Sequence, residues 1–399
     1  MAGDSSKVLI VSPNFYPSAG GVESHLIELI RTFSDVEFSV LANWRPDAGR
    51  AAELFPNVEF HYVWPYDRSL RKWLASSKAT VGLYRAARAT FELLRLMNRR
   101  RWLRELAADI VHFHFLDLDQ ASRLARRLGA PVAIRDWFKM SVGRIGSRAG
   151  LLLTDHTVFT SPSEIVPDEA KTALLATFKN IISVDSKSFE VVKAYQMNHP
   201  GNSWFIPNSV NTDLFRPSRH AGKKFRVGFA GRAGKSGEDL LKIVIRELGP
   251  RVSWRVALAG EANDVRRGVG PRGGADVELF HNLDYLGMPE FYAGIDILFN
   301  PFPGEGIGRT SLEAMACGVP VLAVGQGDKY PIRNGETGYV LPPNPKVIAE
   351  MIRRLQKDAE LIKAMGGMAR AAVEREFSNS AVLPNVRAVY TQLASDVTA

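Results

Sequence analysis

The stretch that decides the fold is Gly304-Glu305-Gly306-Ile307-Gly308-Arg309-Thr310-Ser311-Leu312-Glu313, which continues as Ala314-Met315-Ala316-Cys317-Gly318-Val319-Pro320-Val321-Leu322. Its first half is a glycine-rich turn, and glycine lets the backbone approach a ligand closely. The second half predicts a short helix over 309–316, capped by Gly318, and then a buried strand over 319–324. A loop that leads into a helix and then a strand is typical of a parallel α/β fold.

Two carboxylates, Glu305 and Glu313, flank the start of this predicted helix. Helix N-terminal amides bind anions, so a phosphate would lie between the two acids. Each acid could then bind hydroxyl groups on its own side of the phosphate. A sugar nucleotide has this order of groups: sugar hydroxyls, diphosphate, ribose hydroxyls. The alternative is an ordinary surface turn with two solvated glutamates.

Length and composition indicate an ordinary soluble protein of two domains. The chain has 399 residues, of which 46% are hydrophobic and 23% charged, and one core rarely serves so long a chain. The single cysteine, Cys317, suits a reducing compartment and is expected to be a packed thiol. The polar N-terminus is not a signal peptide, and no apolar run approaches the roughly 20 residues of a spanning helix. The expected localisation is cytoplasmic.

Strand-like and helical segments alternate along the whole chain, which predicts parallel βαβ units. In the first half, strands are expected at 8–11, 38–41, 110–115, 132–134, 181–184 and 204–206, with helices at 22–33, 79–106, 119–128 and 187–195. In the second half, strands are expected at 225–230, 255–259, 277–280, 297–300 and 319–324, with helices at 238–247, 289–294, 309–316 and 345–356.

The predicted fold class is therefore α/β, with two Rossmann-like doubly wound domains facing a central cleft. Ligands of such folds bind outside the carboxyl ends of the strands. The expected divisions are a first domain over 1–215, a polar linker over 216–224, a second domain over 225–375, and a C-terminal helix over 376–399 that returns to the first domain.

The chain resembles the family 4 retaining glycosyltransferases of GT-B fold along nearly its whole length. The resemblance rests on segments that follow the family's order: Gly20-Gly21-Val22-Glu23-Ser24-His25, Asp109-Ile110-Val111-His112-Phe113-His114, Ile206-Pro207-Asn208-Ser209-Val210-Asn211, Gly228-Phe229-Ala230-Gly231-Arg232 with Lys235, and 305–320. It implies a metal-independent enzyme of polysaccharide biosynthesis that moves a hexosyl group from a nucleoside-diphosphate sugar to a glycan or lipid-linked acceptor. The donor is a co-substrate, and no cofactor is expected. The first domain would take the acceptor and the second the nucleotide sugar.

The resemblance also assigns roles to single residues. It implies four catalytic residues: Arg232 and Lys235 would neutralise the diphosphate, His114 would contact the donor sugar at the reacting centre, and Glu305 would bind the sugar hydroxyls. Glu313 would bind the ribose. The remaining donor-binding residues would be Gly20, Gly21, Gly306, Ile307, Gly308, Arg309 and Thr310. Catalysis would then depend mainly on positioning and electrostatics, with a donor phosphate oxygen taking the acceptor proton.

Plainer interpretations stand beside several of these roles. Gly20 and Gly21 could be an ordinary turn between strand and helix, and Arg232 and Lys235 ordinary surface cations. Lys235 lies closer to the arginine than is usual in the family. His112 shares a strand face with His114 but is expected to be structural.

A metal site is a further alternative for the first domain. Asp117 and Asp119, with the two histidines, could suggest one. Asp119 is also well placed as a helix N-cap, and no metal is expected.

Some segments depart from the family pattern. Ser209 and Asn211 replace a common glycine and aspartate, Arg135-Asp136 stands where a His-Asp pair is frequent, and Gln326-Gly327-Asp328 lacks the usual paired glycines. These departures bear on the identity of the sugar and the acceptor rather than on the class of reaction.

The net charge of +9 is unevenly placed, because 85–104 holds seven arginines and one glutamate. A basic amphipathic helix there could lie on an anionic membrane surface, which would make the enzyme peripheral, or could be a solvated face over a core stripe. No nucleic-acid partner is expected. Rival functions are a sugar-nucleotide epimerase or glycan phosphorylase on the same fold, and a non-catalytic sugar-nucleotide sensor.

Overall fold

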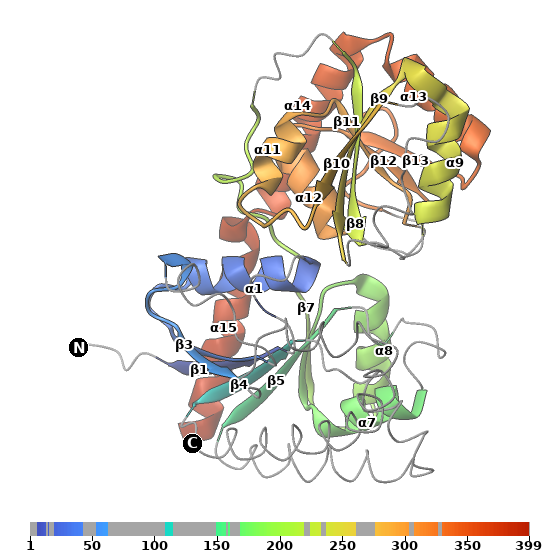
Figure 1. Ribbon diagram of the computed structural model, residues 1–399. Helices are drawn as coiled ribbons and strands as arrows, with labels where there is room; N and C mark the ends of the chain where they lie inside the picture. Colours follow the sequence, from blue (N-terminus) through green and yellow to red (C-terminus); the bar gives the residue numbers. More distant parts are fainter. Residues whose placement is uncertain are drawn as a thin grey trace, which may run out of the picture. The chain divides into compact units, whose positions relative to one another are not determined.

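The computed structural model describes residues 6–12, 15, 20–42, 53–62, 108–114, 149–156, 159, 168–218, 224–232, 237–260, 276–302, 307–325 and 329–398. These residues form two compact units, each built on a parallel sheet (Figure 1). The first unit takes Met1–Pro17, Leu29–Pro207 and Asn385–Ala399, and the second takes Ser18–Glu28 and Asn208–Pro384.

The first unit holds a seven-stranded sheet in which all neighbouring strands are parallel, in the order β3-β2-β1-β4-β5-β6-β7. This order reverses between β1 and β4, as in a doubly wound fold. The strands are β1 (Lys7–Val11), β2 (Glu37–Ala42), β3 (Glu59–Tyr62), β4 (Ile110–His114), β5 (Gly150–Asp155), β6 (Asn180–Ser183) and β7 (Asn202–Phe205), and two helices of this unit are α7 (Asp168–Thr177) and α8 (Ser186–Gln196). Helix α1 (Gly21–Thr32) is divided after Glu28, so that its first part clusters with the second unit and the part from Leu29 with the first.

Strand β4 shows how the first sheet is packed on both faces. All five of its residues are buried, which is typical of a parallel strand covered on each side. Val111 and Phe113 belong to the apolar core that includes residues of α7 and α8. By the alternation of a strand, His112 and His114 face the opposite way, and His112 contacts Tyr390 of the C-terminal helix.

The second unit holds a six-stranded parallel sheet in the order β10-β9-β8-β11-β12-β13. The order reverses between β8 and β11, which again matches a doubly wound fold. The strands are β8 (Arg226–Arg232), β9 (Ser253–Ala259), β10 (Asp276–His281), β11 (Ile297–Asn300), β12 (Val321–Val324) and β13 (Gly338–Leu341), and the helices are α9 (Glu238–Leu248), α11 (Met288–Ala293), α12 (Arg309–Ala316), α13 (Pro345–Leu355) and α14 (Ala359–Glu376).

Helices cover both faces of the second sheet, α9 and α13 on one side and α11, α12 and α14 on the other (Figure 1). Helix α9 turns the fully buried Leu241 and Val244 inward, and α13 turns Ile348 and Ile352 inward; these residues belong to one apolar core with the sheet. Their spacing of three or four residues places them on one helix face. The second sheet is therefore packed between helices on both of its faces.

The C-terminal helix α15 (Asn379–Thr398) belongs to both units, with the division after Pro384 inside the helix. Its second part packs on the first sheet, where Leu393 lies against Gly150 and Tyr390 against His112. Residues Asn385–Ala399 cluster with the first unit. The segment Asn208–Phe215, placed with the first domain in the sequence analysis, clusters with the second unit, and Phe215 packs on Tyr285 and Tyr292.

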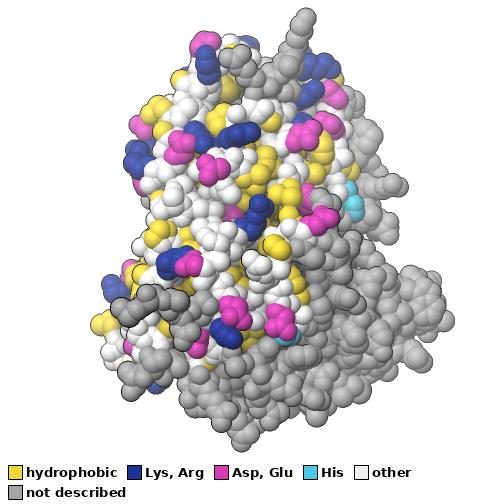
Figure 2. Space-filling model, turned by 90° about the vertical axis from the view of Figure 1, so that its left-hand side faces the viewer, with side chains coloured by type: hydrophobic (Ala, Val, Ile, Leu, Met, Phe, Trp, Pro, Cys, Tyr) yellow, Lys and Arg dark blue, Asp and Glu magenta, His cyan; other side chains and the backbone are white. Residues whose placement is uncertain are grey.

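The predicted class of two parallel α/β domains is confirmed. Strands β3, β5 and β13 and helix α7 were not predicted, and the expected strand at 132–134 lies outside the described residues. Among the described residues, no helix is long and apolar enough to cross a membrane. On the face shown in Figure 2, the described Lys, Arg, Asp and Glu side chains are interspersed rather than gathered by sign. The arginine-rich segment 85–104 is outside the described residues.

Candidate active site

The candidate site of the second unit lies at the carboxyl ends of the two strands where the sheet order reverses. Arg232 is the last residue of β8, and the neighbouring strand β11 ends at Asn300, from which the glycine-rich segment of the sequence leads to α12. Ligands of doubly wound folds bind at this switch point. The fold therefore brings together two of the segments that the sequence analysis singled out.

Helix α12 begins directly after Gly308, which is in an extended conformation and has no side chain to cap the helix. The backbone carbonyl of Gly308 accepts from the amides of Ser311 and Leu312. A helix start without a side-chain cap keeps its first amides available for an anion. Ile307 is partly exposed, Gly308 is exposed and Thr310 is partly exposed, as donor-binding positions would require.

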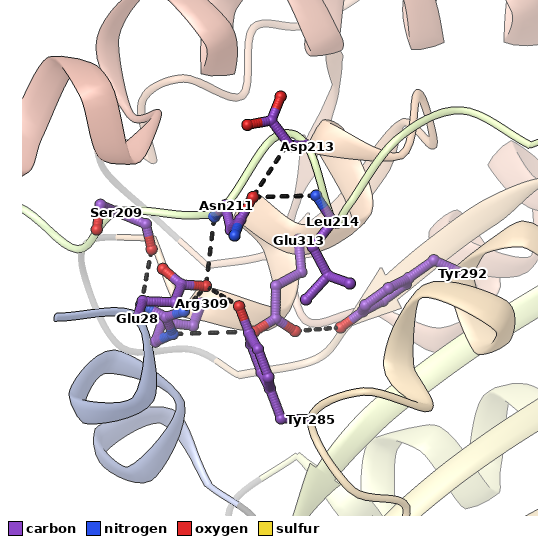
Figure 3. A network of polar contacts seen from close by, with 9 residues as sticks. All are labelled: Glu28, Ser209, Asn211, Asp213, Leu214, Tyr285, Tyr292, Arg309 and Glu313. Atoms are coloured by element: carbon purple, nitrogen blue, oxygen red, sulfur yellow. Dashed lines mark hydrogen bonds and ion pairs between the residues drawn. The ribbon is translucent and has the colours of Figure 1, made fainter. Parts of the chain in front are cut away.

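Arg309 is turned inward, away from solvent, into a network of polar groups (Figure 3). Its Nη2 lies 2.7 Å from Oε1 of Glu28, and its Nη1 donates to the backbone carbonyl of Ser209 at 2.6 Å. Its Nε lies 3.8 Å from Oε1 of Glu313. The guanidinium predicted to bind the donor is thus held by protein groups, because a buried arginine must be paired.

Glu28, on α1, is the acceptor at the centre of this network. Its Oε1 accepts from the Tyr285 hydroxyl at 2.6 Å and from the Asn211 amide at 3.3 Å, besides pairing with Arg309. Burial, together with the charge of Glu28, raises the pKa of Tyr285 well above its ordinary range. Tyr285 is therefore a hydrogen-bond donor at any physiological pH.

Glu313, predicted to bind the ribose, lies one helical turn beyond Arg309 on α12 and is also buried. Its Oε2 accepts from the Tyr292 hydroxyl at 2.9 Å. Burial raises the pKa of Glu313 to about 7, against the opposing influence of Arg309. The carboxyl group therefore changes its protonation state near neutral pH, which is unusual for a glutamate.

The loop 208–214 completes the network, and it contains two of the residues that depart from the family pattern, Ser209 and Asn211. The Asn211 side chain accepts from the amides of Asp213 and Leu214, both at 3.0 Å, which is a local turn. The Ser209 carbonyl accepts from Arg309. Asn211 and Ser209 thus shape the loop that packs on Arg309 and Glu28.

A second cluster surrounds Arg232. Its Nη2 lies 3.3 Å from both carboxylate oxygens of Glu23 on α1. The Arg232 side chain is 40% exposed, whereas that of Glu23 is 4% exposed. A methyl group built at Gly20 would overlap Arg232 and Glu23, whereas one at Gly21 would only touch Cδ of Arg309 at 3.7 Å. Gly20 and Arg232, predicted separately, therefore meet in the second unit.

In the first unit, His114 ends strand β4, which adjoins the reversal point of that sheet. It is buried, and its Nδ1 lies 3.3 Å from Nε2 of His156. His112 has both ring nitrogens within 2.7 Å of hydroxyls, those of Tyr390 and Thr154. Burial, and secondarily the charge of His156, lowers the pKa of His112 to about 3. His112 is a structural neutral histidine, as expected.

Several predicted site residues lie outside the described part of the chain: Lys235, Glu305, Gly306, Asp117 and Asp119. Within the described part, no group of three or more His, Cys, Asp or Glu side chains is arranged to hold a metal ion. Cys317 is buried, and burial raises the pKa of its thiol to about 12. It is a packed, unreactive thiol, as expected.

Four residues of these clusters were not predicted from the sequence: Glu23, Glu28, Tyr285 and Tyr292. Glu28 carried a signal, since it interrupts the apolar run Leu26-Ile27-Glu28-Leu29-Ile30, whose other four residues are buried. A charged residue at such a position needs a partner. Arg309, between Gly308 and Thr310, carried no local sign that it was this partner.

Comparison with known proteins agrees with this architecture. Residues 224–358 match the family model described as glycosyl transferases group 1. The chain is 24% identical to a D-inositol 3-phosphate glycosyltransferase of Kribbella flavida, over 89% of this chain and 86% of that protein. It is 25% identical to a GDP-mannose-dependent monoacylated alpha-(1-6)-phosphatidylinositol monomannoside mannosyltransferase of Corynebacterium glutamicum, over 94% and 95% of the two chains.

A similar solved structure is that of HepE from Anabaena in complex with UDP-glucose. It has a TM-score of 0.65 and 17% identity, with 98% of this chain and 99% of that chain covered. Together, the two parallel-sheet units and these similarities define a glycosyltransferase of the GT-B fold.

Proposed function

We propose that this glycosyltransferase belongs to the retaining enzymes of family 4. It transfers a hexosyl group from a nucleoside-diphosphate sugar to a glycan or lipid-linked acceptor in polysaccharide biosynthesis. The observation that carries the proposal is that residues with assigned roles follow the strands flanking both reversal points. Gly20 follows β1, His114 ends β4, Arg232 ends β8, and the loop before α12 follows β11. Doubly wound folds bind ligands at these positions.

In the proposed reaction, the bond between the anomeric carbon and the diphosphate breaks while the acceptor hydroxyl bonds to that carbon on the same face. A donor phosphate oxygen takes the hydroxyl proton. Arg232 and Lys235 neutralise the negative charge that develops on the leaving diphosphate, so that no metal ion is needed. The uncapped start of α12 contributes amides to the same diphosphate.

The other residues position the donor. Glu305 binds the sugar hydroxyls, Glu313 the ribose, and His114 the sugar at the reacting centre. The buried network supports this arrangement, since Arg309 and Glu313 are one turn apart on α12 and are both held by protein groups. Preorganised groups need no rearrangement when the reaction occurs.

The proposed location is the cytoplasm, at the membrane face if the acceptor is lipid-linked. The Corynebacterium relative is named for a phosphatidylinositol mannoside acceptor and a GDP-mannose donor, whereas the Anabaena structure contains UDP-glucose. These names support a nucleotide-sugar donor and leave both nucleotides as candidates.

A thermal-shift panel of UDP-, GDP- and ADP-sugars tests the donor class, because a ligand that binds only the folded state stabilises it. One donor is expected to raise the melting temperature. That donor, with a panel of glycan and lipid-linked acceptors, is expected to release a nucleoside diphosphate. Turnover of the donor without any acceptor would indicate an epimerase, and binding without turnover a sensor. Full activity of a folded Glu305→Ala variant would remove Glu305 from its assigned role.

A further inference from the structure

Glu23 is a buried carboxylate that the proposed reaction does not use. It lies in the first turn of α1, and its side chain is 4% exposed. Both of its oxygens lie 3.3 Å from a single nitrogen, Nη2 of Arg232. These distances exceed the roughly 2.7–2.9 Å of a tight charge-assisted hydrogen bond. The contact therefore orients Arg232 without binding it as firmly as a close bidentate pair would.

The neighbouring glycine explains why this contact can form. A methyl group at Gly20 would overlap Nη2 of Arg232 and Oε2 of Glu23. Gly20 is not among the glycines with a positive φ angle, so its backbone conformation does not require a glycine. What position 20 requires is space. The space is filled by the guanidinium of Arg232.

We propose that Glu23 is a positioning residue for Arg232. It holds the guanidinium in the space beside Gly20, at the carboxyl end of β8, where the donor diphosphate is bound. This rests on the proposed function for the role of Arg232 and extends it to a residue on α1. An arginine side chain has many rotamers. If Glu23 fixes one rotamer of Arg232 before the donor binds, the entropy cost of ordering this side chain is no longer part of the reaction step.

The positioning role predicts a particular split in the kinetic constants of Glu23→Gln. We expect kcat to fall about tenfold, because a misplaced Arg232 stabilises the leaving diphosphate less well. The KM for the donor is not expected to rise, because the substitution also removes a negative charge beside the diphosphate site. A merely structural role at the helix start would instead lower the melting temperature and leave kcat per folded molecule unchanged.

A double-mutant cycle ties the effect to Arg232. We expect Arg232→Gln to lower kcat about 100-fold, and Glu23→Gln to have no further effect in that background. The matched control is Glu247→Gln. This carboxylate lies 3.8 Å from Arg353, which is 39% exposed, much like Arg232, and we expect wild-type kcat. If Glu23→Gln lowered kcat by the same factor in the wild-type chain and in the Arg232→Gln variant, the proposal would be overturned.

A crystal structure of Glu23→Gln without donor separates this proposal from the proposed function. The Arg232 side chain is expected to leave the space beside Gly20, and an unmoved Arg232 would contradict the positioning role. This readout needs no turnover. If the wild-type chain released no nucleoside diphosphate from any donor, the proposed function would fail, while the structure would still decide whether Glu23 holds Arg232.

Discussion

The guanidinium of Arg309 lies 2.7 Å from the carboxylate of Glu28, and the two side chains are only 4% and 1% exposed. Glu28 is on α1, and Arg309 is the first residue of α12. This ion pair therefore joins the helix that follows Gly20 to the helix that follows the glycine-rich loop. Both helices start at segments with a proposed role in donor binding, so the pair fixes the two starts relative to each other within the second unit.

Removing one member of this pair is expected to be strongly destabilising. Glu28→Ala leaves Arg309 buried, with Glu313 at 3.8 Å as the remaining carboxylate among the described residues, and we expect a loss of about 3–5 kcal/mol in the free energy of unfolding. Urea denaturation followed by circular dichroism measures this loss. Glu247→Ala, which breaks the half-exposed pair with Arg353, is the control and should cost less than about 1 kcal/mol. Equal losses in the two variants would contradict the buried role of Glu28.

The raised pKa of Glu313 predicts a pH-dependent stability. In the unfolded chain this carboxyl group titrates near its ordinary value of 4.5, whereas in the folded chain its pKa is about 7. Between these values the folded state binds more protons, so this group's contribution to stability falls as the pH rises through that range. Glu313→Gln, which stays neutral, removes this contribution.

The measurement is the difference in unfolding free energy between Glu313→Gln and wild type at pH 4.5 and pH 8. We expect the difference to shift in favour of the variant by about 3 kcal/mol on going to the higher pH. The control is Glu247→Gln, which removes a half-exposed carboxylate 3.8 Å from Arg353, and the change measured for Glu313→Gln should exceed the one measured for this control. A constant difference for Glu313→Gln would mean that the carboxyl group titrates normally in the folded chain.

The elements around the second reversal point were predictable because each has a local signal. Strand β11 and helix α12 were placed at their observed bounds, since an apolar run, a glycine-rich turn and Gly318 mark them. Strand β13 was missed because its four residues directly follow the turn 335–337, and only its two middle residues are partly buried, so the segment shows no alternation of buried and exposed residues. The Glu28–Arg309 pair was missed for a different reason. It joins residues far apart in the chain, and the local sequence around a buried charge does not predict which distant residue pairs with it.

Membrane binding by the arginine-rich segment 85–104 is a separate prediction, made from the sequence because the segment lies outside the described residues. Vesicles with anionic lipid are expected to sediment the chain at low salt and to release it at high salt. Replacing Arg95, Arg99 and Arg100 by glutamine should weaken binding about fivefold for each arginine, from about 1 kcal/mol apiece. Sedimentation that is independent of anionic lipid content would exclude this role and favour a solvated helix face.

Two adjacent glycines of α14 provide a matched test of packing in the second unit. A methyl group at Gly366 would overlap the backbone carbonyl of Gly318, just after α12, whereas one at Gly367 meets nothing within 4 Å. We expect Gly367→Ala to raise the free energy of unfolding by about 0.5–1 kcal/mol, because alanine is the better helix former. Gly366→Ala brings the same gain in helix propensity, but its methyl group forces α14 away from α12. Overpacking of this kind lowers the free energy of unfolding by about 1–3 kcal/mol. Thermal denaturation of the two variants side by side measures both effects, and stabilisation of both by alanine would show that α14 does not pack closely on Gly318.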